Sequence, residues 1–177
     1  MATPWRTLPP PRTPEPVEPL AFWRAAVGRL AAGQRVGVAL VVDHTRHSPG
    51  TRGARMLVGS AEGDAQVQGT VGGGVMEARI LAALRAALDG PGAPGEVTTL
   101  IHRAGRGDGD GRPSGLLCAG SQRVATLVLE PRWALAPLIE ALGRLDADAR
   151  GLLTLAPGLV TCEDGPVPAP TDRPLTL

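Results

Sequence analysis

Three stretches of this sequence combine the backbone freedom of glycine with charged or polar residues. The first is RHSPGTRGARM, in which Gly50 and Gly53 permit tight turns. Arg46, Arg52 and Arg55 bring three guanidinium groups to the same stretch. A guanidinium presents a planar fork of donors that suits a phosphate or carboxylate, so the stretch is a candidate anion-binding loop. The alternative is an ordinary hairpin whose arginines face water.

The second stretch is GTVGGGVME, in which a predicted strand runs into three glycines and then into a predicted helix. Gly72, Gly73 and Gly74 would let a ligand approach the backbone closely, while the first helical N–H groups point at it. This pattern is typical of an anion cradle, but a tight strand-to-helix turn explains it equally well. Glu77 stands in the first turn of the helix, where the helix dipole already favours a carboxylate.

The third stretch is SGLLCAGSQ, which places the thiol of Cys118 between apolar residues and a flexible, hydroxyl-bearing turn. A thiol that is partly exposed beside cationic groups has a lowered pKa and becomes a good thiolate ligand. Soft sulfur suits a thiophilic metal centre. The alternative is a small buried residue, which is the commoner fate of a free cysteine.

Bulk composition excludes several classes of protein. The net charge is +1 and all 18 basic residues are arginine, so nothing drives the chain toward nucleic acid or anionic lipid. No apolar run reaches the roughly 20 residues that a membrane helix needs, and the N-terminus lacks the apolar region of a signal peptide. We therefore expect a cytoplasmic protein in which Cys118 and Cys162 are free thiols.

The pattern of apolar residues predicts one domain of α+β or α/β class, with a single mixed sheet flanked by about three helices. Residues 1–19 hold seven prolines and are expected to form a disordered leader, with the domain at 20–163 and a loose tail at 164–177. Helices are predicted at 20–33, 75–89 and 133–145. Strands are predicted at 35–43, 54–58, 65–71, 97–103 and 123–130, with two weaker strands at 152–155 and 158–162.

Taken together and in this order, the three stretches resemble the sequence blocks of the XdhC/CoxI family. The blocks are SPGTRGARMLV, GTVGGGVMEARIL and CAGSQRVATLVLEP, and the resemblance covers about residues 35–145. It implies an accessory protein that binds molybdenum cofactor, protects it during sulfuration and assists its insertion into a molybdenum hydroxylase of the xanthine dehydrogenase or CO dehydrogenase type. Such a protein is a chaperone and not an enzyme.

The resemblance also implies where the cofactor would bind. Cys118 takes the place of the family's cofactor-associated cysteine and would be a molybdenum ligand. The remaining expected cofactor-binding residues come from all three blocks: Ser48, Arg52, Arg55, Gly72, Gly73, Gly74, Glu77, Gly120 and Ser121. The cofactor carries a phosphate and a dithiolene-held molybdenum, and these stretches offer an anion cradle, guanidinium groups and a soft ligand.

The sequence departs from the family pattern at two points. The usual Cys-Gly-Gly is here Cys118-Ala119-Gly120, and Arg46 stands where a glycine is frequent. Long members carry a second, Rossmann-like domain, so two alternatives stay open: a separately encoded Rossmann-like half is a partner, or the chain is a lone-domain member. An apo hydroxylase subunit, a cysteine desulfurase and a second copy of the chain are the other expected partners. The client enzyme and the pterin nucleotide form stay open.

Two other functions compete with the chaperone. One is a cysteine- or metal-dependent transferase or hydrolase built on the same loops. The other is a protein-interaction module that has lost cofactor binding, which the change at Ala119 would favour.

Overall fold

A computed structural model describes residues 18–59, 67–91, 95–102, 120–147, 152–156 and 158–163. In chain order the helices are α1 (Pro19–Ala31), α2 (Gly74–Asp89) and α3 (Pro131–Asp146). The strands are β1 (Val36–His44), β2 (Arg55–Gly59), β3 (Val67–Thr70), β4 (Glu96–His102), β5 (Gly120–Leu129), β6 (Leu152–Ala156) and β7 (Leu159–Glu163). None of the three helices in these ranges has the length and apolar character needed to span a bilayer.

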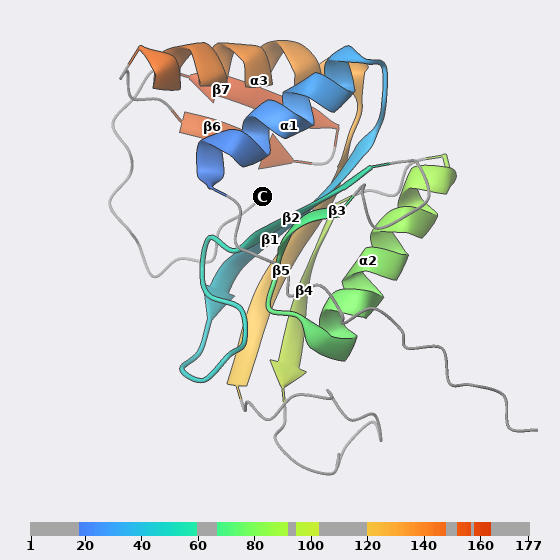
Figure 1. The fold of residues 1–177 in the computed structure, drawn as a ribbon, viewed down its shortest axis with the longest axis vertical. Coiled ribbons are helices and arrows are strands. Elements are labelled where there is room, and N and C mark those ends of the chain that lie inside the picture. The colour runs from blue at the N-terminus through green and yellow to red at the C-terminus, as the bar shows by residue number, and fades with distance from the viewer. Residues whose placement is uncertain are drawn as a thin grey trace, which may run out of the picture.

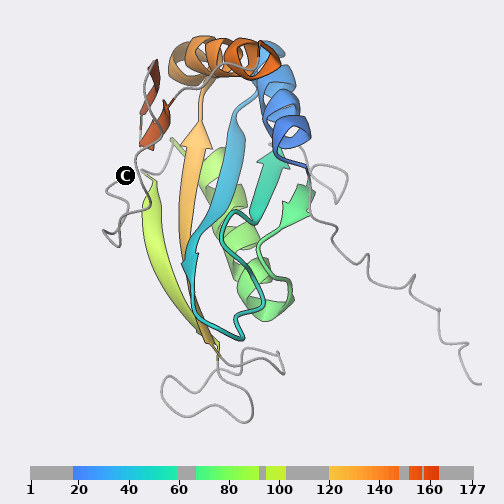
Figure 2. The same cartoon turned by 90° about the vertical axis from the view of Figure 1, so that its left-hand side faces the viewer.

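The central sheet has five strands in the order β3-β2-β1-β5-β4. Each pair of neighbouring strands is antiparallel, and β6 and β7 form a separate antiparallel hairpin. Figure 1 shows α2 on one face of the sheet, while α1, α3 and the hairpin lie at the top on the other. In Figure 2 the lower part of that second face lies open to view beneath α1 and α3. The fold is therefore a three-layer α+β arrangement.

Strand alternation divides the apolar side chains between two cores. On β2, Leu57 points to the core beneath α1 and α3, which includes Phe22, whereas Met56 and Val58 point to the core beneath α2. This follows from the two-residue period of a strand, which sends successive side chains to opposite faces. Both faces of the sheet are covered at its upper end, which explains the continuous apolar run at the start of β1.

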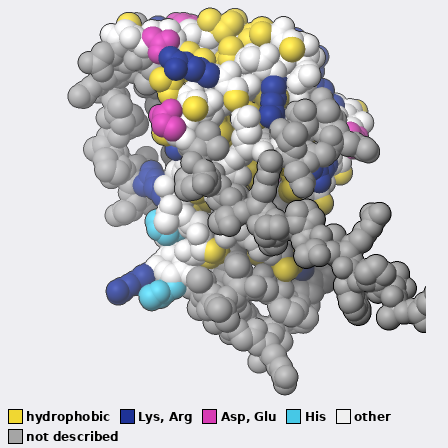
Figure 3. Space-filling model, viewed as in Figure 1, with side chains coloured by type: hydrophobic (Ala, Val, Ile, Leu, Met, Phe, Trp, Pro, Cys, Tyr) yellow, Lys and Arg dark blue, Asp and Glu magenta, His cyan; other side chains and the backbone are white. Residues whose placement is uncertain are grey.

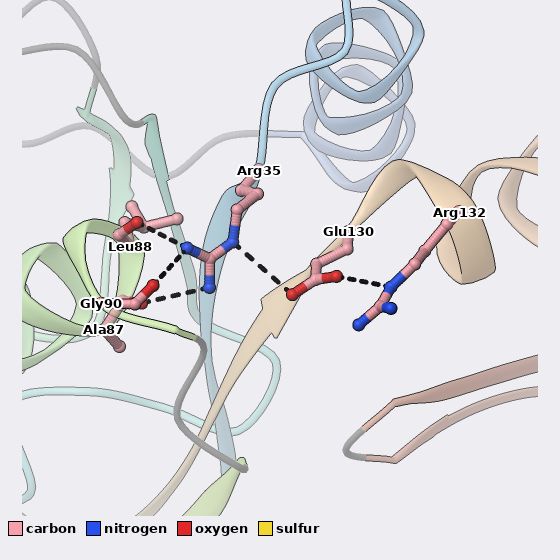
Figure 4. A network of polar contacts seen from close by, with 6 residues as sticks. All are labelled: Arg35, Ala87, Leu88, Gly90, Glu130 and Arg132. Atoms are coloured by element: carbon pink, nitrogen blue, oxygen red, sulfur yellow. Dashed lines mark hydrogen bonds and ion pairs between the residues drawn. The ribbon is translucent and has the colours of Figure 1, made fainter.

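Polar contacts fix the ends of two helices. The carboxylate of Glu18 accepts a hydrogen bond from the backbone N–H of Ala21 at 2.9 Å, and backbone N–H donors at the start of α1 lower the pKa of Glu18. At the C-terminus of α2, Arg35 Nη1 donates to the carbonyls of Leu88 and Gly90, both at 2.7 Å (Figure 4). A cation suits this negative end of the helix dipole, so Arg35 ties β1 to the end of α2.

The α+β class expected from the sequence is confirmed, and each predicted helix and strand coincides with an observed one within a few residues. The structure refines the sheet, because the last two strands pair only with each other and all pairs are antiparallel. The strand predicted to begin at Arg123 in fact begins at Gly120. The helix α1 begins at Pro19, the last residue of the predicted leader, and the rest of that leader up to residue 17 and the tail from 164 lie outside the described residues.

Candidate functional site

The side chain of Gln122 joins the three sequence blocks. Gln122 is only 2% exposed, and no other polar side chain in the described ranges is classed as buried. Its Oε1 accepts hydrogen bonds from Ser48 Oγ at 3.0 Å and from the backbone N–H of Gly50 at 3.1 Å, while its Nε2 donates to the carbonyl of Val71 at 3.0 Å. Because the Gly50 N–H can only donate and the Val71 carbonyl can only accept, a single orientation of the amide satisfies both.

Three glycines let the same segments pack backbone against backbone. A Cβ atom added to Gly50 would overlap the carbonyl oxygen of Val71. One added to Gly72 would lie 2.7 Å from the Gly50 nitrogen, and one added to Gly120 would lie 2.8 Å from the Ser48 nitrogen. Gly72 and Gly120 also have φ values of 126° and 152°, which side chains other than glycine rarely adopt. We call this contact region, formed by Ser48, Gly50, Val71, Gly72, Gly120 and Gln122, the Gln122 junction.

A second set of contacts holds the third block to the β1–β2 loop beside the junction. The backbone N–H of Ser121 donates to Thr45 Oγ1 at 2.7 Å, and the N–H of Thr45 donates to the Ser121 carbonyl at 2.8 Å. Ser121 is thus fixed mainly through its backbone. Its hydroxyl lies 3.5 Å from that of Thr45, which is long for a hydrogen bond between hydroxyl groups. The start of β5 therefore extends the antiparallel pairing with β1 into the loop.

The carboxylate of Glu77 holds the glycine turn from inside. Its Oε2 accepts hydrogen bonds from Thr70 Oγ1 at 2.5 Å, from the Val71 N–H at 2.8 Å and from the Gly73 N–H at 3.0 Å. Thr70 Oγ1 in turn accepts from the Gly72 N–H at 3.1 Å. The sequence predicts that the first helical N–H groups point at a ligand anion, and this stays a prediction, because the two N–H groups that the carboxylate of Glu77 binds, those of Val71 and Gly73, precede the helix. Glu77 is therefore a residue that shapes the turn.

Backbone geometry explains why this turn needs its three glycines. Gly72, Gly73 and Gly74 have φ values of 126°, 76° and 71°, so three consecutive residues adopt a conformation that a Cβ atom disfavours. The N-cap of α2 is Gly73, and no side chain caps that end of the helix. The first-turn N–H groups of α2 thus have no side-chain cap, while the carboxylate of Glu77 offsets part of the positive end of the helix dipole.

Replacing Glu77 by Ala should destabilise the turn. The change removes the acceptor of three hydrogen bonds and leaves half-buried donors, which costs about 1–3 kcal/mol of unfolding free energy. Glu77→Gln keeps an amide oxygen that accepts and should cost less than Glu77→Ala. Chemical denaturation measures both, with Glu140→Ala as the control, because the exposed Glu140 pairs with Arg144 one turn further along α3, an i,i+4 ion pair on the helix surface. Equal stability of the parent and Glu77→Ala would show that Glu77 does not hold the turn.

The arginines of the first stretch, RHSPGTRGARM, separate into two groups. Arg46 and Arg52 are exposed on the β1–β2 loop. The Nε of Arg55 donates to the Gly53 carbonyl at 2.9 Å, and its guanidinium lies 5.9 Å from the ring centroid of Phe22 in α1. Arg55 therefore faces the α1 side of the sheet, whereas the turn leads to α2 on the other side. The structure does not bring Arg55 to the glycine turn.

The β1–β2 loop carries several basic side chains. Figure 3 shows arginine and histidine side chains gathered at the lower left, over this loop. His44 and His47 are both exposed, and His44 Nδ1 accepts a hydrogen bond from the Arg52 N–H at 3.1 Å. His47 has a φ of 69°, an uncommon value for a residue with a side chain. The loop thus concentrates positive charge next to Ser48 and the junction.

The structure brings together Ser48, Gly72, Gly120 and Ser121 of the predicted site, with Gly73, Gly74 and Glu77 in the adjoining turn. Cys118, the predicted molybdenum ligand, lies outside the described residues, and its role stays a prediction. Within the described ranges, no group of three or more His, Cys, Asp or Glu side chains is arranged to hold a metal ion.

Sequence reasoning missed the residue at the centre of the junction. The predicted strand at 123–130 begins one residue after Gln122, so the prediction places Gln122 in the preceding loop and not in β5. Extending the strand back would have put Gln122 in register with Val124 and Val128, which point to the core beneath α2. A polar residue in a buried register is the signal that could have identified it, because such a side chain needs hydrogen-bond partners.

Comparison with known proteins gives one result at the level of the family. A model described as the XdhC and CoxI family matches residues 29–99, which contain the first two blocks, β1 to β3, α2 and part of β4. A search of curated proteins finds no match to the chain.

Proposed function

We infer from the match over residues 29–99 that this chain belongs to the XdhC and CoxI family, whose members are accessory factors in the maturation of molybdenum hydroxylases. From this premise we propose that the chain binds molybdenum cofactor as its cargo, and assists its sulfuration and its insertion into a hydroxylase of the xanthine dehydrogenase or CO dehydrogenase type. The chain acts as a chaperone and catalyses no reaction of its own.

The observation that supports the proposal best is the Gln122 junction. Segments that are far apart in the sequence, at Ser48, Val71 and Gln122, are joined through one buried amide. Cys118 is two residues before Gly120, which packs on the backbone of Ser48. Since consecutive Cα atoms are about 3.8 Å apart, covalent connection alone keeps the Cα of Cys118 within about 7 to 8 Å of that of Gly120. A cargo bound by Cys118 would therefore be close to the first block.

The chemistry around the junction fits the cargo. A thiolate at Cys118 is a soft ligand for molybdenum. The phosphate of the pterin requires positive charge, which Arg46 and Arg52 offer on the exposed loop and which the uncapped N-terminus of α2 supplements. Glu77 and Gln122 hold the backbone around the cargo and need not contact it. Gly72, Gly73 and Gly120 allow the segments to approach one another.

Loading with cofactor tests the proposal directly. The chain is produced in cells that synthesise molybdenum cofactor, and bound molybdenum and pterin are measured per mole of protein. The parent should carry both, and Cys118→Ala should lose most of its molybdenum. Cys162→Ala is the matched thiol control and should bind as the parent does, because Cys162 is on β7, in the hairpin that packs with α3.

The outcomes separate the parts of the proposal. If Cys118→Ala keeps its molybdenum, the thiol is not a ligand. If the parent carries neither molybdenum nor pterin, the carrier function is wrong. Affinity capture on the parent should also recover an apo hydroxylase subunit, a cysteine desulfurase or a separately encoded Rossmann-like half. Capture of a hydroxylase subunit by a chain that never carries cofactor would instead identify an interaction module.

A further inference from the structure

The outer edge of β4 has no partner strand among the described residues. β4 (Glu96–His102) is an end strand of the central sheet, and in the described part of the chain it pairs only with β5. Its pairing with β5 continues over seven residues without a register shift. The opposite edge, β3, has only four residues. β4 is thus the longer and more regular of the two edges.

The side chains of β4 do not protect this edge. Val97 and Ile101 are 37% and 60% exposed, and strand alternation puts them on one face with Thr99 between them. Monomeric proteins usually protect an edge strand with lysine, proline, a bulge or an inward-pointing charge, because its free N–H and C=O groups attract another strand. The interior of β4 has none of these devices. Such an edge is expected to be covered by a partner strand.

We propose that this partner is β4 of a second copy of the chain, paired antiparallel about a two-fold axis at Thr99. In that register Val97 of each copy is opposite Ile101 of the other, so apolar side chains meet on one face. In the same register Glu96 is opposite His102 at the two ends of the paired segment. The segment is therefore complementary to itself, as a two-fold interface requires. A continuous sheet of ten strands results, five from each copy.

This arrangement has a consequence for the candidate site. Residues 100–102 of β4 pair directly with residues 120–122 of β5, so the Gln122 junction is one strand away from the interface. From strand spacings of about 4.8 Å and rises of about 3.4 Å per residue, the Gly120 residues of the two copies would be about 25 Å apart. Each copy would therefore carry its own cargo on a shared sheet.

Molar mass in solution tests whether the dimer forms through this edge. The parent should elute as a dimer in size-exclusion chromatography with light scattering, and Ile101→Lys should shift it to monomer. Ile139→Lys is the matched control, because Ile139 is 51% exposed on α3, away from β4. A monomeric parent at high micromolar concentration, or a dimer that survives Ile101→Lys, would overturn the proposal.

Cysteine cross-linking tests the register. In a background with Cys118→Ser and Cys162→Ser, Thr99→Cys should form a disulfide dimer under mild oxidation, because only residue 99 is opposite itself. Thr98→Cys should not, since its opposite residue is Leu100 and its side chain points to the other face. Equal cross-linking at both positions, or at neither, would contradict the two-fold register. Both substitutions are at exposed positions, so the fold should tolerate them.

Discussion

Replacing Gln122 by Glu is expected to lower the stability of the chain and to abolish loading of the cargo. The new carboxylate has no N–H to donate, so the Val71 carbonyl loses its partner and faces a negative charge. The site is almost fully buried, and a charge left there without a cation is costly. We expect a loss of at least about 2 kcal/mol in unfolding free energy, with the three segments released from one another.

The pH dependence of this variant gives a further check. Burial raises the pKa of a carboxyl group above its unfolded value, and the protonated form can again donate to the Val71 carbonyl. The deficit relative to the parent should therefore be smallest below pH 4 and should grow as the pH rises through the raised pKa. Denaturant titrations between pH 4 and 8 measure it. Gln34→Glu, at an exposed position before β1, is the matched control and should follow the parent. A variant as stable as the parent at pH 7 would refute the role of Gln122.

Replacing Gly50 by Ala should have the second large effect. The added methyl group would overlap the carbonyl oxygen of Val71 and approach Gln122 Oε1 to 2.5 Å. The loop must move away to relieve the overlap, and overpacking of this kind costs about 1–3 kcal/mol. Because the loop contains Ser48, cargo binding should fall together with stability.

Gly28→Ala provides the matched control for Gly50→Ala. Gly28 is in the last turn of α1, and a Cβ added there meets no atom within 4 Å. The same chemical change should there be neutral or stabilising by up to about 1 kcal/mol, because alanine favours helix. Thermal unfolding and bound molybdenum are measured for both variants. If Gly50→Ala behaves like Gly28→Ala, the close packing of the loop on the glycine turn is not a feature of the protein in solution.

Much of the fold could be predicted because local patterns determined it. The spacing of Ile80, Leu84 and Leu88 predicted a helix, and these residues form its buried face. The apolar run from Val36 predicted a buried strand, and it became one of the central strands of the sheet. Proline at residue 131 was read as the end of a strand, and it is also the first residue of α3, where its fixed φ is favourable.

The site was harder to predict because its contacts join residues that are distant in the sequence. The three glycines at 72–74 were correctly identified as a turn with unusual backbone freedom. Nothing in the local pattern indicated that the carboxylate of Glu77 would accept hydrogen bonds from the N–H groups of Val71 and Gly73. The side of the sheet that Arg55 occupies could have been inferred, because Arg55 alternates with Met56 and shares its face with Leu57.

The structure thus separates residues that build the site from residues that would contact the cargo. Gln122 and Glu77 have their side-chain oxygens bound within the protein, and Gly50 and Gly72 allow the segments to meet. The groups left for an anionic cargo are the exposed arginines of the β1–β2 loop and the start of α2. The charge of these groups is exposed to solvent. This suits a carrier, because a carrier must release its cargo as well as bind it.

Amide chemical-shift mapping of the full chain tests most directly whether the three blocks form one cargo site. Spectra of the ¹⁵N-labelled chain are recorded with and without molybdenum cofactor. Our account predicts that the amide signals of Gly50, Gly74 and Gly120, one from each block, move together on loading, while that of Gly28 in α1 stays in place. Shifts confined to a single block, or centred away from the Gln122 junction, would contradict it.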